Sequence, residues 1–244
     1  MAQALLKWVG HALDLLYPRN CRFCTTPLTE TQVGVVCPAC LATAKPITPP
    51  FCRRCALPFS GQLDAQIECG YCQDLEFHFS SAYAACRAEG VVRDCIHRLK
   101  YNREIYYLPH LAGWLIDAGR RWIDWAQVDA IVPVPLHPVK ERSREFNQAK
   151  LLAQELARAV GRPLWPQVIR RVKATPSQTR LDARSRRVNM RGAFAIRSAA
   201  ALAGRRVVLV DDVFTTGATL DACASILLRS GTTDVIALTV ARGV

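Results

Sequence analysis

The segment RVVLVDDVFTTGAT, residues 206–219, decides the fold of this 244-residue chain. Its apolar run Val207–Val210 predicts a buried strand that ends on two acidic residues, Asp211 and Asp212. A short turn rich in hydroxyls follows, and a helix is expected at Thr219–Arg229. Ligands of open α/β sheets bind at the carboxyl ends of the strands, where the N–H groups of a following helix attract phosphate. The segment therefore predicts a site for a ligand with both phosphate and hydroxyl groups, such as a sugar phosphate. Two simpler interpretations, a helix cap and a receiver-like metal site, explain TTGAT less well.

The flanking sequence alternates apolar strands with amphipathic helices. Strands are expected at Ala82–Cys86, Ala130–Val134 and Asp234–Val240, and helices at Gly90–Lys100, Leu108–Trp122 and Asn147–Val160. This alternation is typical of an α/β fold, a parallel sheet with helices on both faces. The segment Arg170–Arg191 is dense in Arg, Ser and Thr and is expected to be a long mobile excursion. It is either a lid over the site or an ordinary solvated loop.

Eight of the 11 cysteines form four C-x-x-C pairs before residue 73. Two such pairs direct four thiolates at one ion, so the pattern predicts two closed, structural Zn²⁺ sites without catalytic chemistry. With no export signal recognised, this spacing favours metal over disulfides. Consecutive pairing is the simplest arrangement, but the spacing also permits a crossed one that joins Cys21 and Cys24 to Cys52 and Cys55. Cys86, Cys95 and Cys223 are expected to be buried. The eight predicted ligands are Cys21, Cys24, Cys37, Cys40, Cys52, Cys55, Cys69 and Cys72.

The chain carries 32 Lys and Arg against 20 Asp and Glu, a formal charge of +12. Such an excess favours an anionic partner, either nucleic acid or a polyphosphate ligand, without choosing between them. The spacing of apolar residues in 1–18 predicts an amphipathic helix. This helix is expected to pack on the protein or on a partner, and attachment to a membrane surface is the alternative. No stretch approaches the roughly 20 apolar residues of a transmembrane span. Because the cysteine spacing favours metal over disulfides and no export signal is recognised, we expect a cytoplasmic protein.

Several motifs together resemble one family. DDVFTTGAT resembles the phosphoribosyl-diphosphate motif of type I phosphoribosyltransferases. The further motifs LKY (99–101), VPVPLHP (132–138) and FNQA (146–149), with Gln178, Leu181, Arg186, Asn189 and Phe194, are similar to the ComF/GntX family. The resemblance implies a double zinc ribbon at 19–78 and a phosphoribosyltransferase-like domain at 79–244. One departure is Glu145, where the family often has glycine. If that glycine serves an unusual backbone angle or admits diphosphate, Glu145 weakens binding there.

The resemblance also implies ligand and residue roles. The ligand would be phosphoribosyl diphosphate with Mg²⁺, which binds largely through phosphates. Asp211 and Asp212 would hold the ribose hydroxyls, and the Pro133–His137 turn, with Pro133, Val134 and Pro135, would face the diphosphate. The 5′-phosphate would lie on Thr215, Thr216, Gly217, Ala218 and Thr219. Candidate catalytic residues are Asp211, Asp212, His137 and Arg186, although His137 is also interpretable as a loop hydrogen-bonding residue. Candidate cations for the diphosphate are Arg142, Arg144, Lys173, Arg180, Arg184 and Arg186.

The implied biological role is DNA uptake in natural transformation, through handling of single-stranded DNA. The implied partners are single-stranded DNA and a DNA-uptake helicase or translocase, which would bring the protein to the inner face of the membrane. Trp8, Phe51, Phe59, Tyr71 and Phe77 are candidates for base stacking. The alternative function is an active phosphoribosyltransferase with an unknown acceptor in nucleotide metabolism. A third, a DNA-binding regulator that senses the ligand, lacks a helix-turn-helix pattern.

Overall fold

The fold is taken from a computed structural model that describes residues 19–59, 68–73, 75–174, 190, 192–198 and 202–243. The helix expected at 1–18 lies outside the described residues, as does most of the excursion expected at 170–191. Within the described part, no helix is long and apolar enough to cross a membrane.

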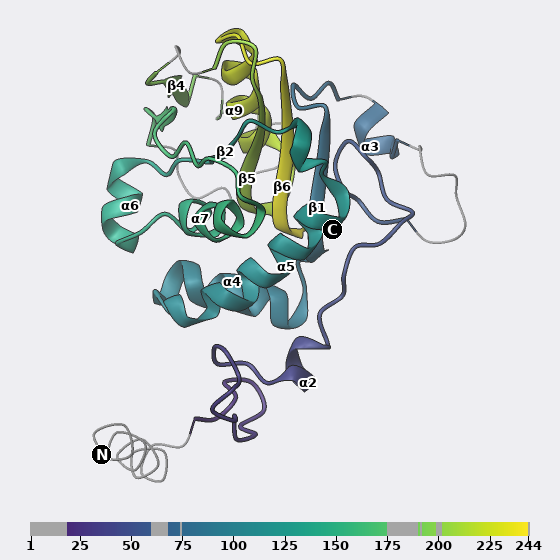
Figure 1. The fold of residues 1–244 in the computed structure, drawn as a ribbon, viewed down its shortest axis with the longest axis vertical. Helices are drawn as coiled ribbons and strands as arrows, with labels where there is room; N and C mark the ends of the chain where they lie inside the picture. Colours follow the sequence, from purple (N-terminus) through teal and green to yellow (C-terminus); the bar gives the residue numbers. More distant parts are fainter. Residues whose placement is uncertain are drawn as a thin grey trace.

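A four-stranded parallel sheet forms the centre of the larger domain (Figure 1). Its strand order is β1-β6-β5-β2, and the strands span Ser81–Arg87, Asp234–Arg242, Arg206–Phe214 and Ala130–Pro133, respectively. The two central strands, β6 and β5, are largely buried because helices cover both faces. The predicted strands and their parallel arrangement are thus confirmed.

Alternate residues of β5 supply two separate cores. Val208 and Val210 pack with α4 (Gly90–Asn102), α5 (Leu108–Trp122) and α7 (Gln148–Val160). Val207 and Leu209 pack on the opposite side with α9 (Ala218–Arg229). This alternation follows from the two-residue period of a strand. The three cysteines predicted to be buried lie in these cores, Cys86 and Cys95 in the first and Cys223 in the second.

Two parts of the fold differ from the sequence-based expectation. The start of Arg170–Arg191 is not an excursion, because β3 (Ile169–Arg171) pairs antiparallel with β4 (Phe194–Ile196) in a separate two-stranded sheet. Val168, Ile169 and Phe194 bury apolar side chains there, which anchors the segment. Helix α6 (Pro138–Arg144) was also missed, since its seven residues are too short for an apolar period. The short helices η1 and η2 span Ile105–Tyr107 and Trp125–Gln127.

The cysteine-rich region consists of two ribbons built on the same turn. In each, the first cysteine N–H donates to a carbonyl five residues ahead, Cys21 to Thr26 and Cys52 to Leu57, both at 2.8 Å. The residue after the second cysteine takes a left-handed backbone conformation in both. A short helix follows the first cysteine of the second pair and contains the other: α2 (Pro38–Leu41) contains Cys40, and α3 (Gly70–Gln73) contains Cys72. Figure 1 shows α2 beyond α4 and α5, and α3 beside the sheet.

Candidate functional site

The turn between β5 and α9 has the geometry of a phosphate loop. Helix α9 begins at Ala218, one residue earlier than predicted, and Gly217 precedes it with a φ of 76°. A Cβ at this glycine would lie 2.7 Å from the rings of Phe214 and Phe77. Only glycine therefore fits both the backbone angle and the space. The turn leaves the first N–H groups of α9 directed toward the carboxyl end of the sheet, where an anion is stabilised.

The acidic pair lies at the same end of β5. Asp212 is 4% exposed, and its Oδ2 lies 2.7 Å from Lys100 Nζ at the end of α4. Asp211 Oδ1 accepts a hydrogen bond of 2.9 Å from the Asp212 N–H. Desolvation and the Asp212 carboxylate raise the pKa of Asp211 to about 7. The two neighbouring acids thus differ, since Asp212 has a lysine at ion-pair distance and Asp211 has no such cation among the described residues.

The end of β2 lies beside this pair and is held by Asn147. The Val134 N–H donates to Val210 O at 2.9 Å, and the Val134 carbonyl accepts from Asn147 Nδ2 at 3.0 Å. The Asn147 Oδ1 accepts from the N–H groups of Ala149 and Lys150, which caps α7. One side chain in the FNQA motif therefore fixes the β2 turn and starts a helix.

His137 caps α6. Its Nδ1 accepts a hydrogen bond of 3.3 Å from the Val139 N–H, as expected of a histidine with a role in loop structure. The side chain does not line the cavity that holds the acidic pair, within the part of the chain that is described. Its catalytic role remains a prediction. Arg186, the other basic catalytic candidate, lies outside the described residues, as do Arg180 and Arg184.

A cavity of about 190 Å³ brings the predicted ligand residues together at the carboxyl ends of β2 and β5. Of the predicted residues, it includes Asp211, Asp212, Thr215, Thr219 and Val134, together with the cation Arg144. Three further cations line it that sequence reasoning did not assign to the site, Lys100, Lys140 and Arg171. The other predicted loop residues adjoin the cavity along the chain without lining it: Pro133, Pro135, Thr216, Gly217 and Ala218.

Glu145 adopts a backbone angle that favours glycine, the residue that the family often has at this position. Its φ is 71°, in the left-handed region that favours glycine, and it ends α6. Its carboxylate forms an ion pair with Arg103, which ends α4 with a φ of 60° and donates to the Ser143 carbonyl at 2.9 Å. Glu145 does not line the cavity of the acidic pair, among the residues described. The glycine expected at this position would therefore serve the backbone angle.

The cysteines form two four-thiol clusters with consecutive pairing, Cys21/24/37/40 and Cys52/55/69/72, and the crossed alternative is wrong. Within each cluster the sulfur atoms all lie within 4.8 Å of one another. Zn–S bonds of about 2.3 Å in a tetrahedron give S···S distances of about 3.8 Å, so both clusters suit Zn²⁺. The Thr26 hydroxyl lowers the pKa of Cys24 to about 6, and the Cys55 thiol lowers the pKa of Cys52 to about 4. Other thiols of the same clusters shift the opposite way, since burial raises the pKa of Cys40 and Cys72.

Each ribbon is attached to the larger domain at a different place. In the first, the N–H groups of Val35 and Val36 donate to Nε2 of the buried His110 of α5 at 3.1 and 3.2 Å. In the second, Tyr71 Oη donates to Thr216 O at 3.2 Å, and the Phe77 ring packs against Phe214. The second zinc ribbon therefore contacts the phosphate loop directly.

Arg242, near the end of β6, joins the second ribbon to the phosphate loop. Its side chain is buried, and its guanidinium donates to Cys55 O at 2.7 Å, to Thr215 O at 2.9 Å and to Phe214 O at 3.3 Å. The guanidinium also lies 4.8 Å from the Phe214 ring centroid. Sequence reasoning missed this residue, because a single arginine at the end of an apolar strand looks like a surface residue.

The aromatic residues proposed for base stacking are mostly internal. Phe51 and Phe77 are 9% and 8% exposed and pack against Trp122 and Phe214, respectively. Phe59 and Tyr71 are partly buried against the core of α9. Trp8 lies outside the described residues. Apolar packing explains the four described rings, so they do not offer the free faces that stacking needs.

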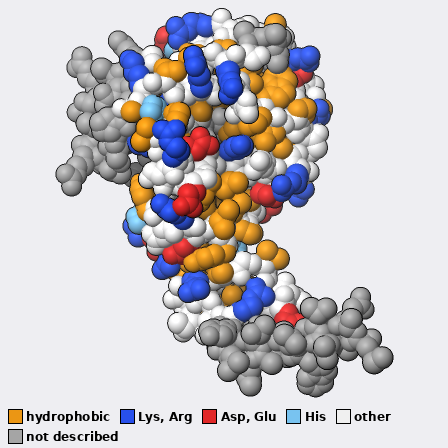
Figure 2. Space-filling view, turned by 90° about the vertical axis from the view of Figure 1, so that its left-hand side faces the viewer, with side chains coloured by type: hydrophobic (Ala, Val, Ile, Leu, Met, Phe, Trp, Pro, Cys, Tyr) orange, Lys and Arg blue, Asp and Glu red, His pale blue; other side chains and the backbone are white. Residues whose placement is uncertain are grey.

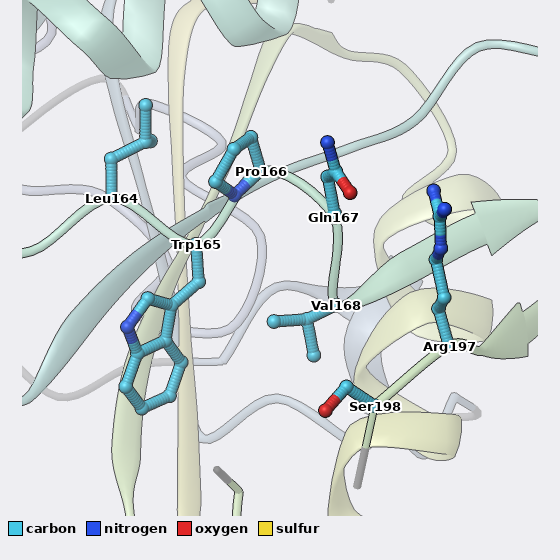
Figure 3. A pocket seen from close by; sticks show the side chains of 7 residues that line it. All are labelled: Leu164, Trp165, Pro166, Gln167, Val168, Arg197 and Ser198. Atoms are coloured by element: carbon cyan, nitrogen blue, oxygen red, sulfur yellow. The ribbon is translucent and has the colours of Figure 1, made fainter.

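Another cavity, of about 470 Å³, lies between residues 164–168 and the end of β4 (Figure 3). Trp165 and Leu164 line one side, and Arg197 and Ser198 line the other. None of its described lining residues is acidic, and none belongs to the acidic-pair cavity. This cavity therefore lacks the paired acids expected of a sugar-phosphate site.

Comparisons with known proteins find two family domains in the chain. A double zinc ribbon domain matches residues 12–76, and a phosphoribosyl transferase domain matches residues 143–243. The purine phosphoribosyltransferase of Pyrococcus horikoshii is 22% identical, with a TM-score of 0.33 over 53% of this chain and 68% of that chain.

Curated relatives cover nearly the whole chain. The DNA utilization protein YhgH of Salmonella typhimurium is 33% identical over 91% of this chain and 96% of its own length. Competence protein F of Haemophilus influenzae is 32% identical over 88% of this chain and 93% of its own. Competence protein ComFC of Bacillus subtilis is 34% identical over 41% of this chain and 39% of its own. With its double zinc ribbon and phosphoribosyltransferase-like domain, the chain belongs to the ComF/GntX family.

Proposed function

We propose that the acidic-pair cavity binds phosphoribosyl diphosphate with Mg²⁺. One observation supports this most strongly: two carboxylates, the start of α9 and four cations meet at the ends of two adjacent parallel strands. Asp211 and Asp212 would accept hydrogen bonds from the ribose hydroxyls, and the loop at 215–219 would hold the 5′-phosphate. Arg171 would face the diphosphate, whereas Lys140 and Arg144 line the side of this cavity that adjoins a second one. Mg²⁺ would neutralise the diphosphate through the ligand's own oxygens.

We propose DNA utilisation as the biological role, with single-stranded DNA as the macromolecular partner. Relatives that align over nearly the whole chain are named for DNA utilization and competence. The charge of +12 supports an anionic partner. In this proposal the zinc ribbons occupy 19–78 and the ligand-binding domain 79–244. A DNA-uptake helicase or translocase would bring the protein to the inner face of the membrane.

An active phosphoribosyltransferase is the second candidate. It is favoured because the cavity that contains the two aspartates is also lined by cations, which would stabilise a leaving diphosphate. Catalysis would then consist of positioning the ribose, neutralising the leaving group and excluding water. His137 and Arg186 would have to assist this step. No cluster in the described residues has the hydrogen-bonding pattern of a purine or pyrimidine acceptor pocket, so the binding role is the primary proposal.

A fluorescence-anisotropy titration tests the DNA role. A labelled oligothymidine should bind the protein at about 50 mM salt and lose much of its affinity at about 200 mM, because displaced counterions oppose binding. Absence of binding at the lower salt concentration would refute the role. Diphosphate release, measured with Mg²⁺ and nucleobase acceptors, tests the second candidate separately.

A further inference from the structure

A cavity of about 310 Å³ lies next to the acidic-pair cavity, between the carboxyl ends of α4 and α6. It shares Lys100, Lys140 and Arg144 with that cavity but contains neither aspartate. Its other lining residues are Tyr101, Arg103 and Ser143. The two cavities are therefore contiguous, and the second offers a different set of groups.

Cations dominate the charge of this second cavity. Lys100 is paired with Asp212, and Arg103 is paired with Glu145. Lys140 and Arg144 have no carboxylate within ion-pair distance among the described residues, and Arg144 donates only to the neutral Gln148 amide at 3.0 Å. Burial, then the nearby Arg171 and Arg144, lowers the pKa of Lys140. Two cations held together without an acid are most favourably compensated by an anionic ligand.

An exposed aromatic ring completes the cavity. Tyr101 is 54% exposed, and the Arg144 guanidinium lies 5.3 Å from its ring centroid. Outside this cavity, Tyr106 is 39% exposed, and Arg22 of the first ribbon lies 5.9 Å from its ring centroid. Figure 2 shows hydrophobic and Lys or Arg side chains interspersed on the face with α6. Unlike the buried rings of Phe51 and Phe77, these two have free surface.

We propose that this cavity binds one nucleotide of a single DNA strand, with the base on Tyr101 and the phosphate between Lys140 and Arg144. The proposal rests on the DNA role above and identifies the surface that performs it. A base must be unpaired to stack on a side chain, which favours a single strand over a duplex. Phosphoribosyl diphosphate has no aromatic base to stack on Tyr101.

The stacking contact is tested with two labelled strands, each with a central site flanked on both sides by a minimal spacer. The strands differ only at this site, which carries a base in one strand and is abasic in the other. Base–aromatic stacking contributes about 1–3 kcal/mol per base, so Tyr101→Ala should weaken oligothymidine binding about 5- to 150-fold. Tyr101→Phe keeps the ring and should bind as wild type does. Wild type should prefer the strand with the base, and Tyr101→Ala should not. An equal loss in Tyr101→Phe, or no preference in wild type, would overturn the stacking contact.

The phosphate contact is tested through salt dependence. Lys140→Ala should reduce the slope of log affinity against log salt by about 0.7, the value of one phosphate contact to a single strand. Arg158→Ala is the matched control, because it removes one exposed charge from α7 and should leave the slope unchanged. If wild type binds DNA and both Tyr101→Ala and Lys140→Ala bind it with the same affinity, the proposed site is overturned and the DNA role is left intact. No DNA binding in wild type would overturn both, and full competition by polyglutamate would show a general anion surface instead.

Discussion

The link from the second zinc ribbon to the phosphate loop makes a specific prediction for Arg242→Lys. The buried guanidinium donates to carbonyls of two segments, Cys55 in the ribbon and Phe214 and Thr215 at the end of β5. A lysine keeps the charge but lacks the planar fork that reaches both segments. Loss of two charge-assisted hydrogen bonds, at about 1.5 kcal/mol each, should cost about 3 kcal/mol of unfolding free energy. The loop should also bind phosphoribosyl diphosphate more weakly.

Urea unfolding at a fixed Zn²⁺ concentration measures the first effect, and calorimetric titration of the ligand measures the second. Arg206→Lys is the control, because it makes the same substitution at the other end of the sheet. Arg206 pairs with Asp234 at 2.8 Å near the surface, and its replacement should cost at most about 1 kcal/mol. If Arg242→Lys is no less stable than this control and binds ligand as wild type does, Arg242 does not couple the ribbon to the loop.

Three further changes test the site. Gly217→Ala should destabilise the protein by more than about 1 kcal/mol and should weaken ligand binding. The added Cβ would clash with Phe214 and Phe77, and the backbone has a φ of 76°. An unchanged melting temperature would contradict the assigned geometry. Glu145→Gly should stabilise the protein by about 0.5–1 kcal/mol in urea, because relief of a left-handed backbone outweighs loss of an exposed ion pair, whereas Glu145→Gln should not stabilise it. The pKa of Asp211 is raised to about 7, so its protonation favours the folded state at low pH and this stability is lost as pH rises through about 7. The unfolding free energy of wild type relative to Asp211→Asn should therefore fall between about pH 4, the ordinary pKa of an aspartate, and about pH 7, and a flat difference would show that the pKa of Asp211 is ordinary.

Much of the sheet could be predicted because its signal is local. The run Val207–Val210 is buried on both faces, so it reads as continuously apolar and needs no knowledge of its neighbours. The sequence signal for the two zinc sites is equally local, since the hydrogen bonds of each C-x-x-C turn join residues that are close in the sequence. Strand β3 was missed because its residues, Ile169–Arg171, are mostly polar and are ordered by a partner strand more than 20 residues away.

The site was predicted less completely for a related reason. Asp211, Asp212 and the phosphate loop form one motif, so adjacent residues carry the signal. Lys100 reaches Asp212 from a helix more than 100 residues earlier, and only the LKY motif pointed to it. Arg242 and Tyr101 depend on how separate elements meet, which periodicity does not encode. The contacts of Arg242 and the exposed ring of Tyr101 became visible only in three dimensions.

The most direct test of the central claim is a calorimetric titration of phosphoribosyl diphosphate, with Mg²⁺, into wild type and the Asp211→Asn/Asp212→Asn double variant. Asp117→Asn, an exposed change on α5, serves as the charge control. The proposed site predicts saturable binding by wild type and the control, with heat lost in the double variant while urea shows that it remains folded. Equal affinity in all three proteins, or no binding by wild type, would contradict a phosphoribosyl-diphosphate site at the end of β5.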